Sequence, residues 1–164
     1  MKTTMTMAAL SLAFSVVATS AVHAADGASA SVVAQQNLST AAALQLAQKA
    51  TDIARSRDMK ICIAVTDADG HLLAFTRMQG AYAGCVDASI AKAKSAARFA
   101  IDTITFYDLA RKENLAIGTI PGILPAVGGV VIKHADSVVG SVGISGATDI
   151  TEQQLAVDVA ASLR

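Results

Sequence analysis

The stretch of sequence that decides the fold is residues 60–77, KICIAVTDADGHLLAFTR. Lys60–Thr66 has the pattern of a strand, because alternate side chains point to opposite faces and both sets are apolar or small. Asp67–Gly70 is typical of a turn whose glycine takes a positive φ, and Leu72–Arg77 alternates again. We therefore expect an antiparallel hairpin whose first strand is covered on both faces.

Amphipathic patterns on both sides of this hairpin predict helices. Residues Ser39–Ala54 place apolar side chains at helical spacing, and Ser39 is suited to cap the helix. Val86–Ala97 carries a second apolar stripe of the same period. A shorter helix is expected to begin at Asp102 or Thr103 and to run through Arg111.

The last third of the chain predicts a second hairpin and a final helix. Leu115–Val127 is broken by glycines and prolines, which argues against regular structure there. Val130–Lys133 and Val138–Ser145 are expected to be strands, and Asp149 and Glu152 have the spacing of a capping box before the last helix. This order of elements predicts an α+β fold, an antiparallel sheet with helices packed on it, rather than a doubly wound parallel sheet.

Composition agrees with one folded domain. The 164 residues are 53% hydrophobic and 16% charged, which excludes a disordered chain. Thirteen Lys and Arg balance thirteen Asp and Glu, without a basic block, so nucleic acid is not an expected partner.

The beginning of the chain has the pattern of a secretory signal. Lys2 precedes the apolar stretch Met7–Ala18, and Val22–Ala24 offers small residues for cleavage. We expect a signal peptide over residues 1–24, a leader over 25–37 and the domain over 38–164, in a periplasmic or secreted protein. The apolar stretch is too short to span a bilayer, so no membrane span is expected after cleavage, and an uncleaved anchor is the alternative.

Cys62 and Cys85 are the two cysteines of the chain. Export would permit a disulfide, but Cys62 lies inside a strand pattern and Cys85 at a helix start, so we predict two unpaired thiols. Their spacing gives no zinc pattern, and without a Cys-x-x-Cys-His motif any cofactor is held by non-covalent contacts. No nucleophile motif accompanies the histidines, so no catalytic or metal-binding residues are assigned.

Four side chains could reach a metal or a haem iron. His71 follows the first turn and His134 opens the second, and both are chemically able to bind iron, although a plain surface role is the alternative for each. Met78 and Tyr82 lie beside the glycine-rich loop after the first hairpin and could also be iron ligands, with a packing role as the alternative.

Three cations are candidate partners for carboxylates such as haem propionates. Arg77 ends the first hairpin, and Lys92 and Arg98 belong to the helix that follows. A solvated helix face explains Arg98 equally well. Lys92 does not lie on the charged face of this helix. We therefore consider two positions for its side chain: an aliphatic stem that packs beside a pocket, or an ordinary surface position.

The sequence resembles the GlcG/HbpS-like proteins, a family also found as the C-terminal module of PduO-type corrinoid adenosyltransferases. The resemblance is carried by the hairpin segment Ile63–Ala81 and by Ile90–Phe99, Pro121–Gly129 and Val139–Ala147. Together these segments extend the resemblance over nearly all of residues 38–163.

The resemblance implies a profilin-like α+β fold, a symmetric homo-oligomer and, in several members, binding of haem or a related tetrapyrrole. We therefore expect an exported haem-binding protein in haem handling or redox sensing. The first alternative is an enzyme or accessory protein acting on a small organic acid, with Lys92 or Arg98 binding the carboxylate, although no general base is evident beside them. The second is a non-catalytic partner of a sensor kinase, with redox change at Cys62 or Cys85.

Overall fold

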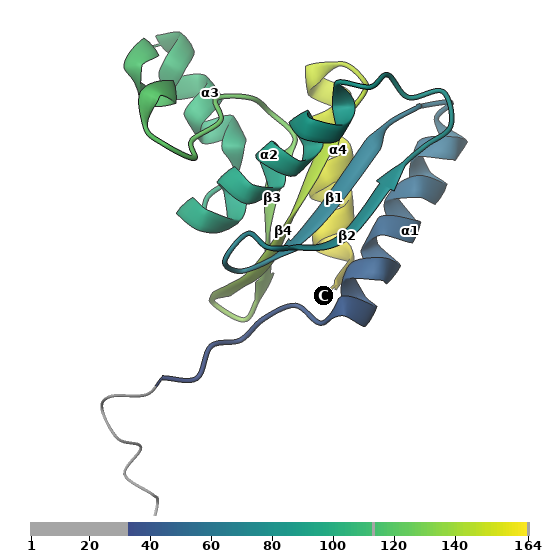
Figure 1. The fold of residues 1–164 in the computed structure, drawn as a ribbon, viewed down its shortest axis with the longest axis horizontal. Helices are drawn as coiled ribbons and strands as arrows, with labels where there is room; N and C mark the ends of the chain where they lie inside the picture. Colours follow the sequence, from purple (N-terminus) through teal and green to yellow (C-terminus); the bar gives the residue numbers. More distant parts are fainter. Residues whose placement is uncertain (1–32, 113, 164) are drawn as a thin grey trace, which may run out of the picture. The chain divides into compact units, whose positions relative to one another are not determined.

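The computed structural model describes residues 33–112 and 114–163, and the fold lies within one compact unit that begins at Gln35. The predicted signal peptide, residues 1–24, and the predicted leader as far as residue 32 lie outside the described residues. Figure 1 shows the arrangement of the unit, whose elements are, in chain order, α1 (Thr40–Ser56), β1 (Cys62–Asp67), β2 (Leu72–Arg77), α2 (Cys85–Phe99), α3 (Thr103–Lys112), the short 3-10 helix η1 (Leu115–Thr119), β3 (Gly129–His134), β4 (Ser137–Ser145), α4 (Asp149–Ala160) and the 3-10 turn η2 (Ala161–Leu163).

The four strands form one antiparallel sheet in the order β2-β1-β4-β3. The two predicted hairpins, β1–β2 and β3–β4, meet through β1 and β4, with Cys62 opposite Ser145 and Asp67 opposite Gly140. The predicted α+β fold, an antiparallel sheet with helices packed on it, is confirmed.

One face of the sheet carries the main hydrophobic core, against α1 and α4 (Figure 1). Ile63 and Val65 of β1 are buried completely on this face, opposite Ile144 and Val142 of β4. Burying such side chains stabilises the fold by roughly 1.5–3 kcal/mol each. This core contains Ile61, directly before β1, and the sheet residues Ile63, Val65, Val130, Ile132, Val142 and Ile144.

The opposite face carries small side chains and is covered by α2. A Cβ at Gly143 would overlap the backbone of Ser89 and Ala93, so α2 lies directly on β4 at this point. The Ser141 hydroxyl donates to the Ala93 carbonyl at 2.6 Å and lies 2.8 Å from the Thr66 hydroxyl. The prediction that β1 is covered on both faces is confirmed.

The start of α1 agrees with the sequence prediction, whereas the start of α4 does not. Ser39 caps α1, since its hydroxyl accepts from the Ala42 N–H at 3.2 Å as predicted. The predicted capping box at Asp149 is wrong, because the residue before α4 is Thr148 and Asp149 is already helical. With Thr148 as the cap, Glu152 lies one position beyond that of a capping-box glutamate; its carboxylate accepts from the N–H groups of Gly146 and Ala147, just before the helix, and pairs with Lys92.

Among the described residues, no helix combines the length and apolar character needed to cross a membrane.

Candidate functional site

Cys62 and Cys85 form a disulfide, so the prediction of two unpaired thiols is wrong. Cys62 begins β1 and Cys85 begins α2; the chain returns from β2 to the start of β1 and brings the two Cα atoms within 5.5 Å. That separation is in the usual range for a disulfide. Sequence spacing could not show this approach, because it depends on how α2 packs on the sheet. Both residues are fully buried.

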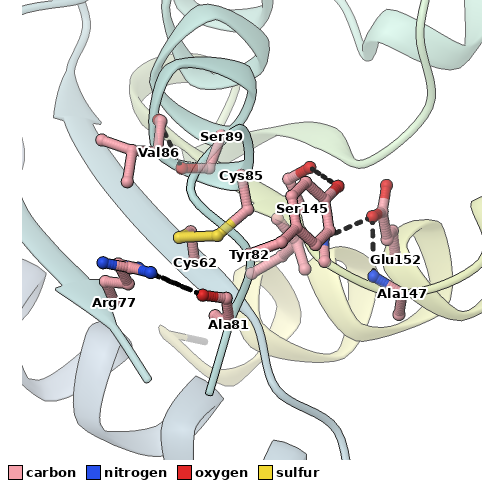
Figure 2. Close-up of a disulfide and its surroundings, with 12 residues drawn as sticks. Cys62, Arg77, Ala81, Tyr82, Cys85, Val86, Ser89, Ser145, Ala147 and Glu152 are labelled. Carbon is pink, nitrogen blue, oxygen red and sulfur yellow. Dashed lines mark hydrogen bonds between the residues drawn. A yellow bond between two sulfur atoms is a disulfide. The ribbon is translucent and has the colours of Figure 1, made fainter. Parts of the chain in front are cut away.

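Arg77 and Tyr82 lie near the disulfide (Figure 2). Arg77 donates through Nε and Nη2 to the Ala81 carbonyl, at 3.2 and 2.7 Å, and so closes the connection between β2 and α2. The Tyr82 hydroxyl lies 3.4 Å from the Ser145 hydroxyl, at the end of β4. Both predicted site residues therefore hold the loop that precedes α2.

Arg77 and Met78 also border a polar cavity of about 430 Å³, which we call the basic cavity. It lies where the last turn of α1, the segment after it and the end of β2 meet. Its lining residues are Thr51, Arg55, Asp58, Met59, Lys60, Thr76, Arg77, Met78 and Gln79.

His71 and Arg98 both bind the turn of the first hairpin. The Asp67 carboxylate accepts from the backbone N–H groups of Asp69 and His71, at 3.0 and 2.7 Å, and its second oxygen is 3.2 Å from His71 Nδ1. Arg98 Nε donates to the Asp69 carbonyl at 3.4 Å. These contacts give both residues a role in stabilising the turn.

His134 ends β3 at an exposed position and borders a cavity of about 370 Å³ together with Leu38 and Val139. The seven predicted site residues therefore do not gather at one place. Their proposed contacts with a ligand stay predictions.

Lys92 is buried, unlike either position considered for it from the sequence. Its ammonium forms an ion pair with Glu152 of α4 and donates to the Ile144 carbonyl at 3.0 Å. The other Glu152 oxygen accepts from the N–H groups of Gly146 and Ala147, at 2.7 and 3.0 Å. The charge of Lys92 is thus compensated inside the protein, although a contact with a ligand stays a prediction.

A second cavity, of about 440 Å³, lies between α3 and α4 and is lined mainly by apolar surface. We call it the α3–α4 cavity. Ile150 at its edge is 83% exposed, which leaves a large apolar side chain in contact with solvent. The lining residues are Ile104, Tyr107, Arg111, Val127, Asp149, Ile150, Gln153 and Gln154.

Three polar side chains of the α3–α4 cavity are joined by hydrogen bonds. Arg111 Nη1 donates to the Tyr107 hydroxyl at 3.1 Å, and this hydroxyl donates to the Asp149 carboxylate at 3.3 Å. The Arg111 guanidinium also lies over the Tyr107 ring, 5.1 Å from its centre. Sequence reasoning missed these residues; the available signal was the i,i+4 spacing of Tyr107 and Arg111 on the predicted short helix.

Residues 38–161 match the family model described as haem degrading protein HbpS-like. The chain belongs to the HbpS-like family. The resemblance stated from the sequence is therefore confirmed. A comparison with the curated proteins finds no match.

Solved structures share this HbpS-like fold. A double mutant of Streptomyces reticuli HbpS has a TM-score of 0.76 at 23% identity, covering 96% of this chain and 99% of that chain. Klebsiella pneumoniae protein ORFY has a TM-score of 0.73 at 26% identity, covering 82% and 97%. A complex of PduOC with haem has a TM-score of 0.69 at 21% identity, covering 77% and 94%. Because the HbpS and PduOC structures are less than 25% identical to this chain, their similarity supports the fold alone.

Proposed function

We propose that this HbpS-like protein binds haem in the α3–α4 cavity. Family membership supports a haem-related function. The observation that carries the location is the combination of apolar walls with the Arg111–Tyr107 hydrogen bond in one cavity.

A haem site needs apolar surface for the macrocycle, a cation for the propionates and a ligand for the iron. The residues of the cavity can provide all three. Ile104, Val127 and Ile150 provide apolar surface for the macrocycle. Arg111 is a cation with the planar donor geometry that carboxylates such as the propionates match. Tyr107 provides an oxygen of the kind that binds haem iron in catalases.

Arg111 also supports the proposed role of Tyr107 as an iron ligand. A tyrosine that binds iron does so through a negatively charged oxygen, and a guanidinium donating to that oxygen complements its charge. Asp149 accepts the hydrogen bond of the phenol O–H and so fixes the direction of this O–H. Bound haem would supply a redox-active iron; Tyr107 would be its ligand, and Arg111 and Asp149 would hold the Tyr107 oxygen in place.

The proposal includes export and self-association. Residues 1–24 have the pattern of a signal peptide, which motivates a periplasmic or secreted location. The exposed Ile150 at the edge of the cavity motivates a second copy of the chain covering the outer part of the ligand. Cell fractionation tests the location, and sedimentation of the protein with and without hemin tests the assembly.

A hemin titration followed by visible absorption tests the binding. We expect a saturable Soret band for the purified protein and a changed ligand spectrum for Tyr107→Phe. Tyr82→Phe is the matched control, because it removes the same hydroxyl from a residue outside the cavity. Absence of a saturable band contradicts haem binding altogether.

The location is tested by the same spectra on other variants. Single substitutions of His71, His134 and Met78 are expected to leave the spectrum unchanged. A spectrum altered by one of them, with Tyr107→Phe like wild type, would show that the iron binds elsewhere.

The disulfide supports a second candidate function, that of a non-catalytic, redox-sensing partner of a sensor kinase. Cys62–Cys85 joins the start of β1 to the start of α2, and its reduction would free the loop that carries Tyr82. Mass spectrometry after alkylation under oxidising and reducing conditions tests whether the pair changes state in the folded protein. A pair that stays oxidised under both conditions argues against this role.

A further inference from the structure

The segment Val127–Gly129, which leads into β3, is held by both helices that flank the α3–α4 cavity. The Gly128 N–H donates to Oε1 of Gln153, on α4, at 2.8 Å. The Gly129 N–H donates to the Thr103 hydroxyl, at the start of α3, at 3.0 Å. Val127 and Gln153 both line the cavity, and Val127 is buried. The position of this part of the cavity wall therefore depends on side chains from α3 and α4.

Gly128 is also fixed by close contacts with α2 and β4. Its carbonyl accepts from the Ile144 N–H of β4 at 2.8 Å. Gly128 has φ of +94°, a left-handed conformation that favours glycine. A Cβ at this position would lie 2.8 Å from the Ile144 carbonyl oxygen and 3.5 Å from Nζ of Lys92, on α2. Gln153 is thus the contact that holds Gly128 from the side of the cavity.

The chemistry of this hydrogen bond fixes the orientation of the Gln153 amide. A backbone N–H can only donate, so the side-chain atom that faces Gly128 is the oxygen. Gly128 is buried, and leaving its N–H without an acceptor would cost free energy. Gln154, the next residue, is exposed and donates to Asp158 at 2.8 Å. Gln153 rather than Gln154 therefore holds the segment.

We propose that Gln153 is a positioning residue of the haem site: by holding Gly128, it keeps Val127 in the apolar wall of the cavity. This inference rests on the proposed binding of haem in the α3–α4 cavity. Val127 directly precedes Gly128, so a Gly128 amide that turned towards water would carry the Val127 side chain out of place. A wall that is already held before the ligand arrives costs less to order on binding, and this raises the affinity.

Two substitutions separate the acceptor of Gln153 from its size. Gln153→Met has a similar length but offers only a weak thioether acceptor, whereas Gln153→Glu keeps an acceptor oxygen. In the haem-free protein, we expect hydrogen exchange of the Gly128 amide, measured by NMR, to be about tenfold faster for Gln153→Met and close to wild type for Gln153→Glu. In hemin titrations, we expect Gln153→Met to weaken the affinity about tenfold and Gln153→Glu to weaken it less than about threefold. Titration in about 1 M NaCl screens the charge that glutamate adds.

A residue with only a structural role would lower the free energy of unfolding in Gln153→Met and leave the hemin affinity unchanged. Gln45→Met, at an exposed position on α1 outside the cavity, is the matched control and is expected to change exchange and affinity less than about twofold. Equal weakening of the hemin affinity by Gln153→Met and Gln153→Glu would overturn the inference.

Circular dichroism checks that the variants fold. If Gln153→Met does not fold, Thr103→Val and Thr103→Ser take its place, because valine removes the acceptor of the Gly129 N–H and serine keeps it. The expected result is then a weakened hemin affinity for valine and a wild-type affinity for serine. A wild-type protein without a saturable Soret band overturns the proposed function and this inference together. A wild-type band with an unchanged affinity in the variant that lacks the acceptor overturns this inference alone.

Discussion

The ammonium group of Lys92 and the carboxylate of Glu152 form an ion pair that is buried between α2 and α4. Both side chains are less than a tenth exposed, at 7% and 5%. The lysine also donates to Ile144 at the end of β4, and the glutamate accepts from the backbone before α4. One pair therefore ties two helices and the end of a strand together.

Breaking this ion pair on one side is expected to destabilise the fold strongly. Glu152→Gln or Lys92→Met leaves a buried charge without its partner, which costs about 3–5 kcal/mol. Urea unfolding followed by circular dichroism measures the free energy of unfolding. The double substitution is expected to be less destabilised than the sum of the single ones, because it leaves no unpaired charge.

An exposed ion pair provides the control for this experiment. Lys112 and Asp108 of α3 lie 3.5 Å apart with side chains that are 67% and 50% exposed. Lys112→Met is expected to change the free energy of unfolding by less than about 1 kcal/mol. A loss as large as that of Lys92→Met would contradict the explanation by burial.

The elements that depend on local sequence patterns were predicted correctly. The wrong predictions concern contacts between segments that are far apart in the sequence. The hairpin of residues 60–77 and the Ser39 cap could be predicted because alternation, turn residues and capping act between near neighbours. The spacing of Asp149 and Glu152 fitted a capping box equally well. One oxygen of Glu152 does accept from the backbone just before α4, but only the position of α2 shows that the other is paired with Lys92.

The candidate site was less predictable for the same reason. Arg77 and Met78 were singled out and do border one cavity, but Arg55 of α1 and Lys60, just before β1, were not. Tyr107 and Arg111 lie in a helix without a recognisable motif. Their cavity forms where side chains of α3 meet the start of α4, and no local pattern contains that information.

The disulfide is expected to contribute to stability mainly by restricting the unfolded chain. Cys62 and Cys85 are 23 residues apart, and closing a loop of this length corresponds to about 3 kcal/mol. Substituting both cysteines by serine should lower the free energy of unfolding by about this amount. Alkylation of the denatured, unreduced protein followed by mass spectrometry checks the pairing, and two modified cysteines would contradict it.

The contact between α2 and β4 requires glycine at position 143. A Cβ there would overlap the backbone of Ser89 and Ala93, and backbone atoms of a packed helix cannot move aside as a flexible side chain can. Gly143→Ala is therefore expected to cost about 1–3 kcal/mol or more, measured as a lower midpoint of thermal unfolding.

Gly84→Ala is the matched control for this substitution. Gly84 has φ of −63°, and the nearest atom that its Cβ would meet is in the ring of Tyr82 at 3.4 Å. We expect a change of less than about 1 kcal/mol, because alanine restricts the unfolded chain but is less favourable than glycine at the position before a helix. Equal effects of the two substitutions would argue against the close approach of α2.

Asp158 is expected to make stability depend on pH in the acid range. The hydrogen bond from Gln154 at 2.8 Å, and then that from Arg57 at 2.9 Å, lower the pKa of this carboxyl from its usual value of 3.8. Because the folded pKa is the lower one, the unfolded chain binds more protons in this range. The contribution is present above the usual value and is lost as the pH falls through the folded pKa.

The measurement is an NMR titration of the Asp158 carboxyl in wild type, Gln154→Ala and Arg57→Gln. Each substitution is expected to raise the pKa towards 3.8, whereas Lys49→Gln on the neighbouring helix should leave it in place. Since the Arg57–Asp158 pair is partly exposed, its loss should cost less than about 1 kcal/mol near neutral pH. That difference from wild type should shrink as the solution is acidified, and a difference that is constant with pH would contradict the assignment.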